Sequence, residues 1–130
     1  MKTPGLGHVV VTVTDLNRSS KFYADVLGFE VKDIHYDGGS MFTFEVGGVA
    51  FWFVSHKQVP ADDRFSEFRV GLDHLGFKAT NESELSAMAD KLIAAGVDTK
   101  GVETFFTGNK YVSFRDPDNI QLEYWLDFPA

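Results

Sequence analysis

Two histidines and one glutamate have the residue types and the spacing for metal chemistry. His8 and His74 each begin an alternation of apolar and polar residues, and Glu123 lies in a later segment of the same kind. Such an alternation with one apolar face indicates a β-strand. Two imidazoles and one carboxylate leave open positions on a divalent ion for substrate or water. We therefore predict His8, His74 and Glu123 as the ligands of a catalytic metal.

The two histidines hold equivalent places because the sequence contains an internal repeat. Residues Gly7–Val31 align with Asp73–Val97 at an offset of 66 residues, from position 7 to position 73. In both copies the histidine lies on the less apolar side of its strand, away from the side that would cover a helix. A two-fold pairing of the copies would bring both histidines to one concave surface.

Each copy continues as one helix and three strands. Asp15 is predicted to cap a first helix of about 12 residues that ends at Gly28, and Asn81 a second helix that ends at Gly96. The predicted strands that follow are Phe29–Tyr36, Met41–Val46 and Val49–Ser55 in the first half, and Val97–Val102, Tyr111–Arg115 and Ile120–Leu126 in the second. The order βαβββ, found twice, predicts a first module over residues 1–56, a linker over 57–71 and a second module over 72–130, together one composite domain.

Composition restricts the function classes. The 130 residues include no cysteine, so thiolate chemistry is excluded and a metal must be held by nitrogen and oxygen. The formal net charge of -7 argues against a nucleic-acid partner, and no apolar run is long enough to cross a membrane. The N-terminal residues lack a secretory signal, so a cytoplasmic location is expected. The 13 Phe, 4 Tyr and 2 Trp are enough for a core and an aromatic cleft.

The last hairpins of the two halves differ at one chemically important position. When they are aligned on their turns, Gly48 corresponds to Asn119, and Trp52 therefore corresponds to Glu123. A carboxylate in the second half thus has an indole as its counterpart in the first.

The sequence resembles the vicinal oxygen chelate superfamily in two features. One is the doubled strand and helix, and the other is the segment Ser113–Glu123 (Ser-Phe-Arg-Asp-Pro-Asp-Asn-Ile-Gln-Leu-Glu). This superfamily includes glyoxalase I, extradiol dioxygenases, fosfomycin-resistance transferases and bleomycin-resistance proteins. The resemblance implies an α+β fold of two paired βαβββ modules that form a cupped mixed sheet, a small-molecule substrate and a homodimer. It places the ligands on His8, His74 and Glu123. It favours Fe(II) or Mn(II), with Ni, Co or Zn as further possibilities.

Three departures from the family pattern reduce the number of activities that the sequence favours. Glyoxalase I has a fourth ligand, a glutamate, at the position of Trp52, and Glu45 on the adjoining strand is a poor substitute. The extradiol and fosfomycin enzymes have a tyrosine at the position of Ser113. Near the site the only cations are Lys110 and Arg115, which would hold a phosphonate weakly. Strict glyoxalase I and fosfomycin activities are therefore less favoured.

Further residues are candidates for the pocket. Tyr111 shares the side of Ser113 and could supply a phenol, and Trp52 and Trp125 could stack on a planar substrate. His56 follows Trp52 at period two and could act as an acid or base, although an exposed loop position is the alternative. His35 has the same potential with less support.

Three functions compete at this stage. The first is a metalloenzyme with a dioxygenase-like or a lyase- or isomerase-like activity. The second is a metal-free binding protein of the bleomycin-resistance type, which would sequester a small aromatic or cationic molecule. The third is a scaffold in which the three predicted ligands only satisfy hydrogen bonds. The complete ligand set favours the metalloenzyme.

Overall fold

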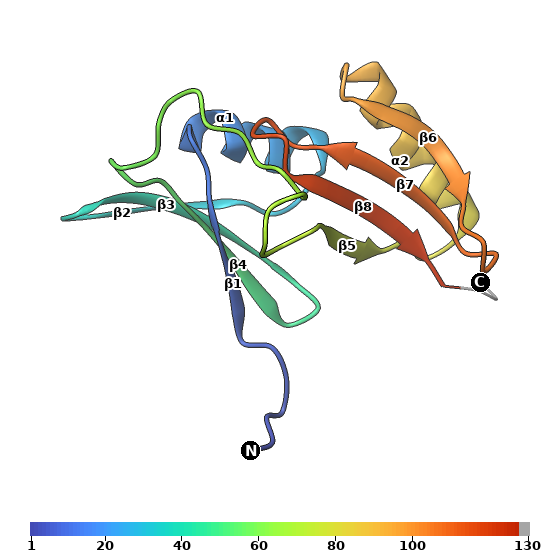
Figure 1. Ribbon diagram of the computed structural model, residues 1–130, viewed down its shortest axis with the longest axis horizontal. Helices are drawn as coiled ribbons and strands as arrows, with labels where there is room; N and C mark the ends of the chain where they lie inside the picture. The colour runs from blue at the N-terminus through green and yellow to red at the C-terminus, as the bar shows by residue number, and fades with distance from the viewer. Residues whose placement is uncertain (128–130) are drawn as a thin grey trace. The chain divides into compact units, whose positions relative to one another are not determined.

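The βαβββ order predicted twice from the sequence is present twice in the computed structural model, which describes residues 1–127 (Figure 1). The chain divides into two compact units, Met1–Asp63 and Arg64–Ala130, and each contains one four-stranded mixed sheet. The last three residues of the predicted second module lie outside the described residues. This architecture confirms the predicted α+β fold.

The first unit contains a short helix that continues as a single wider turn. Leu27 N–H donates to the carbonyl of Phe22 at 3.1 Å, the five-residue spacing of a π-helix. The strands lie in the order β1-β4-β3-β2, with β1 parallel to β4 and the other pairs antiparallel. The elements are β1 (His8–Thr12), α1 (Leu16–Lys21), the π-helical turn η1 (Phe22–Val26), β2 (Lys32–Tyr36), β3 (Gly39–Val46) and β4 (Val49–Val54).

The core of the first unit is aromatic. The Tyr23 ring lies 4.6 Å from that of Phe53, and Phe42 stacks on Phe53 at 4.4 Å with 4° between the ring planes. All three residues are almost fully buried. Much of the high phenylalanine content therefore serves packing in this unit.

The second unit repeats the arrangement with the order β5-β8-β7-β6. Its helix lies along one side of the sheet, where it buries Leu85 and Leu92 against residues such as Val112 and Leu122 (Figure 1). The elements are β5 (Leu75–Lys78), α2 (Glu82–Ala94), β6 (Thr99–Thr104), β7 (Lys110–Arg115) and β8 (Gln121–Leu126). No helix among residues 1–127 combines the length and apolar character that a membrane crossing requires.

Both helices begin and end where the sequence predicts. The side chains of Asp15 and Asn81 accept hydrogen bonds from the backbone N–H three residues later, at 3.0 and 2.8 Å. Gly28 and Gly96 follow the helices with φ of 79° and 74°, the left-handed conformation that glycine adopts without strain.

The predicted start of the second strand is wrong by three residues. Phe29, expected in that strand, donates its N–H to the carbonyl of Tyr23 at 3.0 Å and stacks on Phe44 at 4.3 Å. The strand begins only at Lys32. The helix-ending hydrogen bond and the aromatic contact thus outweigh the strand preference of this segment.

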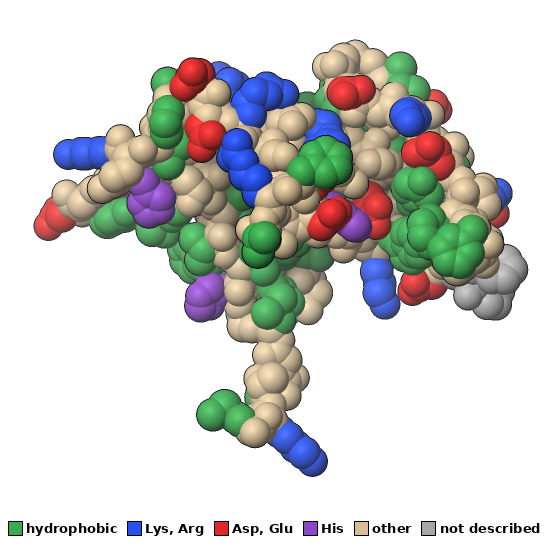
Figure 2. Space-filling view, viewed as in Figure 1, with side chains coloured by type: hydrophobic (Ala, Val, Ile, Leu, Met, Phe, Trp, Pro, Cys, Tyr) green, Lys and Arg blue, Asp and Glu red, His purple; other side chains and the backbone are tan. Residues whose placement is uncertain are grey.

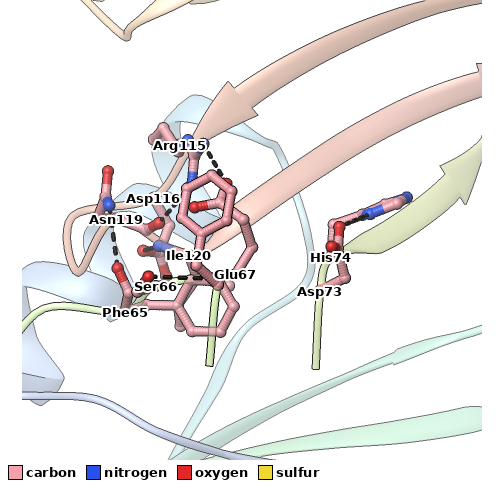
Figure 3. A network of polar contacts seen from close by, with 10 residues as sticks. Phe65, Ser66, Glu67, Asp73, His74, Arg115, Asp116, Asn119 and Ile120 are labelled. Atoms are coloured by element: carbon pink, nitrogen blue, oxygen red, sulfur yellow. Dashed lines mark hydrogen bonds and ion pairs between the residues drawn. The ribbon is translucent and has the colours of Figure 1, made fainter. Parts of the chain in front are cut away.

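The second half of the predicted linker is anchored to the second unit. We call residues 64–73 the strap. Phe65 N–H donates to the carbonyl of Asp118 at 2.9 Å, and the Asn119 side-chain amide donates to the carbonyl of Phe65 at 3.0 Å (Figure 3). Arg115 pairs with Glu67 at 2.5 Å. The strap is therefore held against the β7–β8 turn, just before it leads to His74.

Candidate metal centre and substrate pocket

The strand registers place the two histidines at equivalent positions. His8 is the first residue of β1, and His74 directly precedes β5. Two residues further on, Val10 pairs with Trp52 in the first unit, whereas Gly76 pairs with Glu123 in the second. The registers therefore agree with the hairpin alignment that relates Trp52 to Glu123.

His74 and Glu123 lie together on the side of the sheet opposite α2. His74 Nε2 is 3.4 Å from Glu123 Oε1. The other ring nitrogen, Nδ1, is 2.6 Å from Asp73 Oδ1 (Figure 3). Because an ionised carboxylate only accepts hydrogen bonds, Nδ1 is the donor to Asp73. In the neutral imidazole, Nε2 then presents its lone pair toward Glu123. An outer carboxylate commonly fixes a metal-binding histidine in this way.

Charge at this pair favours protonation of the histidine when no other cation is present. The hydrogen bond to Asp73 is the largest effect and raises the pKa of His74. Burial lowers the pKa in part, and the negative charge of Glu123 raises it again. The Glu123 side chain is only 14% exposed. The site thus contains a partly buried carboxylate, and such a charge is stabilised by a positively charged partner.

A missing side chain makes room for this carboxylate. A Cβ atom at Gly76 would lie 3.3 Å from Glu123 Oε1 and 3.5 Å from its Cγ. In the first unit the corresponding residue is Val10, opposite Trp52. Glycine therefore leaves Glu123 its space without a close contact, and the sequence contained this signal as a glycine in the middle of a predicted strand.

The donor atoms of His74 and Glu123 fit two positions on one metal ion. Ligands about 2.1 Å from a shared ion lie about 3.0 Å apart at a right angle and about 3.4 Å apart at the tetrahedral angle. The observed separation of 3.4 Å falls at the end of that range. Among residues 1–127 no group of three histidine, aspartate or glutamate side chains forms a complete ligand set. The second unit thus brings two of the three predicted ligands together, and His8 is the third residue that the repeat predicts.

A cavity of about 570 Å³ opens beside these two residues. Every predicted site residue of the second half contributes to it. Ser113 pairs with Glu123, and Tyr111 pairs with Trp125, so the four side chains form two adjacent rows. The cavity is lined by His74, Lys100, Glu103, Phe105, Tyr111, Ser113, Gln121, Glu123 and Trp125.

One wall of the cavity is aromatic. Trp125 stacks on Tyr111 at 5.9 Å, and Phe105 contacts Trp125 edge-on at 5.6 Å. Hydrophobic side chains also gather on the surface near the turn between β6 and β7, which contains the exposed Phe106 (Figure 2). Burial raises the pKa of Tyr111, and the charges of Glu103 and Glu123 raise it further. The phenol therefore stays protonated near neutral pH and can donate a hydrogen bond.

Two charged residues of the cavity, Lys100 and Glu103, were not predicted from the sequence. They are three positions apart on β6, and in a regular strand such residues point to opposite sides. The β6–β7 register shifts between Thr99 and Val102, and Gly101 has φ of 77°. This β-bulge turns both charged side chains to the cavity. Gly101 within a predicted strand was the available signal.

The site residues predicted in the first unit are more dispersed. Trp52 lines a separate cavity of about 310 Å³ that also includes Glu45, which lies on the adjoining strand as expected. His8 is exposed. His56 is exposed in the turn after β4 and lines neither cavity, and His35 bonds to Ser40 Oγ through Nδ1 at 2.9 Å.

Comparison with known proteins shows which family the chain belongs to. The chain is 27% identical over 125 residues to metallothiol transferase FosB of Lysinibacillus sphaericus, covering 95% of this chain and 83% of that protein. The crystal structure of a glyoxylase/bleomycin resistance protein/dioxygenase domain from Frankia sp. EAN1pec has a TM-score of 0.86 at 29% identity, covering 99% of this chain and 96% of that one.

A structure of lower identity shares the fold. The fosfomycin resistance protein FosX of Listeria monocytogenes has a TM-score of 0.73 at 21% identity, covering 98% of this chain and 97% of that one. The model of the glyoxalase/bleomycin resistance protein/dioxygenase superfamily matches residues 5–124. This chain therefore belongs to that superfamily, the vicinal oxygen chelate superfamily.

Proposed function

We propose that this protein is a divalent-metal-dependent enzyme that acts on a small substrate with two neighbouring oxygen atoms. The reaction is of the dioxygenase type or of the lyase or isomerase type. The observation that carries the proposal is the pair His74 Nε2 and Glu123 Oε1, 3.4 Å apart at an aromatic cavity. The FosB relative, a metallothiol transferase, supports metal dependence.

The ligand set combines this pair with His8. The part of the proposal that concerns His8 rests on the sequence repeat, because His8 belongs to the first unit. Fe(II) or Mn(II) suits two imidazoles and a carboxylate, and Ni, Co or Zn suits them as well. When bound, such an ion acts as a Lewis acid toward substrate oxygens.

The residues of the chain itself supply orientation and proton chemistry. Asp73 holds the imidazole of His74, and Gly76 leaves the space for the Glu123 carboxylate. The protonated phenol of Tyr111 can donate a hydrogen bond to a substrate oxygen, while Trp125 offers a flat surface to a planar substrate. We assign the donor role to Tyr111 rather than to His56, which lies outside the cavity.

Metal analysis tests the proposal. The protein is reconstituted separately with each of the five ions, freed of loose metal by gel filtration and analysed for metal content. We expect near-stoichiometric uptake of at least one ion in the wild type and loss of most of it in Glu123→Gln. Glu84→Gln is the matched control, since Glu84 is exposed on α2. Uptake that is absent in the wild type, or unchanged in Glu123→Gln, would contradict the proposal.

The aromatic wall supports a second candidate, a metal-free protein that sequesters a planar molecule. In that case a planar aromatic cation should quench tryptophan fluorescence with the same affinity before and after metal removal by a chelator. The enzyme proposal predicts instead that binding of an oxygen-chelating ligand weakens strongly once metal is removed. The same titration therefore separates the two functions.

A further inference from the structure

We infer that Lys100 is a specificity residue that binds a carboxylate group of the substrate. The inference rests on the proposed function for the placement of the rest of the substrate, whose two oxygens would lie near His74 and Glu123. It adds a substrate class to that function: small acids that carry a vicinal oxygen pair at one end and a carboxylate at the other.

A β-bulge in β6 orients Lys100 toward the cavity. Lys100 and Gly101 together oppose Ser113 in the bulge of β6. Within the bulge, the Thr99 hydroxyl donates to the carbonyl of Ser113 at 2.7 Å. Gly101 N–H donates in turn to the Thr99 hydroxyl at 3.2 Å. Thr99 therefore stabilises the bulge that directs Lys100 to the cavity.

Lys100 also differs from the other cations of its sheet in its charge environment. Lys78, Lys110 and Arg115 pair with Asp127, Glu82 and Glu67 at 3.7, 3.0 and 2.5 Å. Within residues 1–127 no carboxylate lies within ion-pair distance of Lys100, although Glu103 shares its side of the sheet. Lys100 lines both the main cavity and an adjoining one of about 270 Å³. The cavity thus contains a cation free to bind an anion.

The strand geometry sets the size of the ligand. Lys100 on β6 lies across Ser113 from Glu123, so two strand spacings of about 4.8 Å separate the two backbones, about 10 Å in total. A lysine side chain that extends toward Glu123 would shorten this gap to about the length of one six-membered ring with a substituent. Trp125 and Tyr111 form the surface beside such a ring.

The charges favour a carboxylate over a phosphonate. One lysine can neutralise one negative charge, whereas Glu103 and Glu123 line the same cavity and would repel a second. A dianionic phosphonate would therefore be poorly compensated. Removal of the Glu103 charge should strengthen the binding of any anion at Lys100.

Three matched ligands test the inference in the metal-loaded protein. Catechol, 3,4-dihydroxybenzoate and 3,4-dihydroxyphenylphosphonate share the oxygen pair and differ only in the opposite substituent. We expect 3,4-dihydroxybenzoate to bind about tenfold more tightly than catechol, the range of a hydrogen bond to a charged group. Lys100→Met should abolish this preference, Glu103→Gln should increase it, and Lys91→Met on the exposed side of α2 should preserve it.

A metal-free measurement separates failure of this inference from failure of the proposed function. In apo protein, ¹⁹F NMR compares 4-fluorobenzoate with 4-fluorobenzamide, and we expect the acid to bind more tightly only when Lys100 is present. A Lys100-dependent preference without any metal uptake would support the carboxylate site and overturn the enzyme proposal. Metal-dependent catechol binding with no Lys100-dependent preference would overturn the inference alone. A Lys100-dependent preference for the phosphonate would overturn the carboxylate assignment.

Discussion

At the scale of single residues, the two halves differ at the position of one glycine and of the residue that pairs with it. Gly76 lies opposite Glu123, and its missing Cβ leaves the space in which the carboxylate reaches His74. The counterpart pair in the first unit is Val10 and Trp52. An internal repeat thus keeps its backbone register while the chemistry of one of its halves changes.

This space predicts a graded effect of side-chain size at position 76. Gly76→Ala should weaken metal binding moderately, because Glu123 must move by a few tenths of an ångström, and Gly76→Val should weaken it more than tenfold. The measurement is metal affinity by competition with a coloured chelator. Val10→Ala, at the equivalent place in the first unit, is the control. Equal affinities for all variants would show that the Glu123 side chain does not need this space.

Asp73 gives a second prediction at this scale. Its carboxylate orients His74, so Asp73→Asn should lower metal affinity by about 10-fold or more without loss of folding. Circular dichroism checks the fold, and the chelator competition checks the affinity. Asp90→Asn on α2 is the matched control, since Asp90 is exposed. An affinity unchanged by Asp73→Asn would show that the hydrogen bond to His74 does not support metal binding.

The candidate site residues of the second unit were easier to predict from the sequence than the residues that position them. His74, Tyr111, Ser113, Glu123 and Trp125 were predicted from the repeat and from alternation along strands, and the structure brings them to one cavity. Lys100 was not predicted as a site residue. Side chains alternate strictly between the two sides of a strand only where the strand register is regular. A bulge reverses the side to which the following residues point, and its presence depends on pairing with another strand.

At the scale of elements, the strap shows how a segment without helix or strand can be well anchored. Its contacts are hydrogen bonds to the β7–β8 turn and the ion pair between Glu67 and Arg115 (Figure 3). From the sequence, residues 64–71 of the strap were expected to belong to a linker, and residues 72–73 to the second module. Tertiary contacts of this kind have no periodicity, so no local pattern could predict them.

The ion pair makes the strap sensitive to acid. The hydrogen bond from Arg115 lowers the pKa of Glu67 below its ordinary value of 4.5. A lowered folded-state pKa contributes stability that is present above the unfolded pKa and is lost as pH falls through the folded one. Thermal unfolding of the wild type and Glu67→Gln should therefore differ at pH 7 and converge as the pH falls well below 4.5. A gap in melting temperature that stays constant over this range would contradict the assignment.

At the scale of the whole molecule, the chain consists of two units of like topology and unlike cavities. One cavity is lined by Trp52 and the other by His74 and Glu123. Two four-stranded sheets with matching order were predictable because the repeat specifies both. The two backbones pair in the same register, so only the side chains distinguish the two cavities.

If ligands come from both units, metal binding must stabilise the fold through each of them. A ligand that binds only the native state stabilises it by about 2.7 kcal/mol at 100 times its dissociation constant. The metal ion should therefore raise the melting temperature of the wild type by several degrees, and His8→Ala or His74→Ala should remove most of that rise. His35→Ala is the matched control, because His35 is an exposed histidine bonded to Ser40. A full metal-induced rise in His8→Ala would exclude His8 from the ligand set and restrict the site to the second unit.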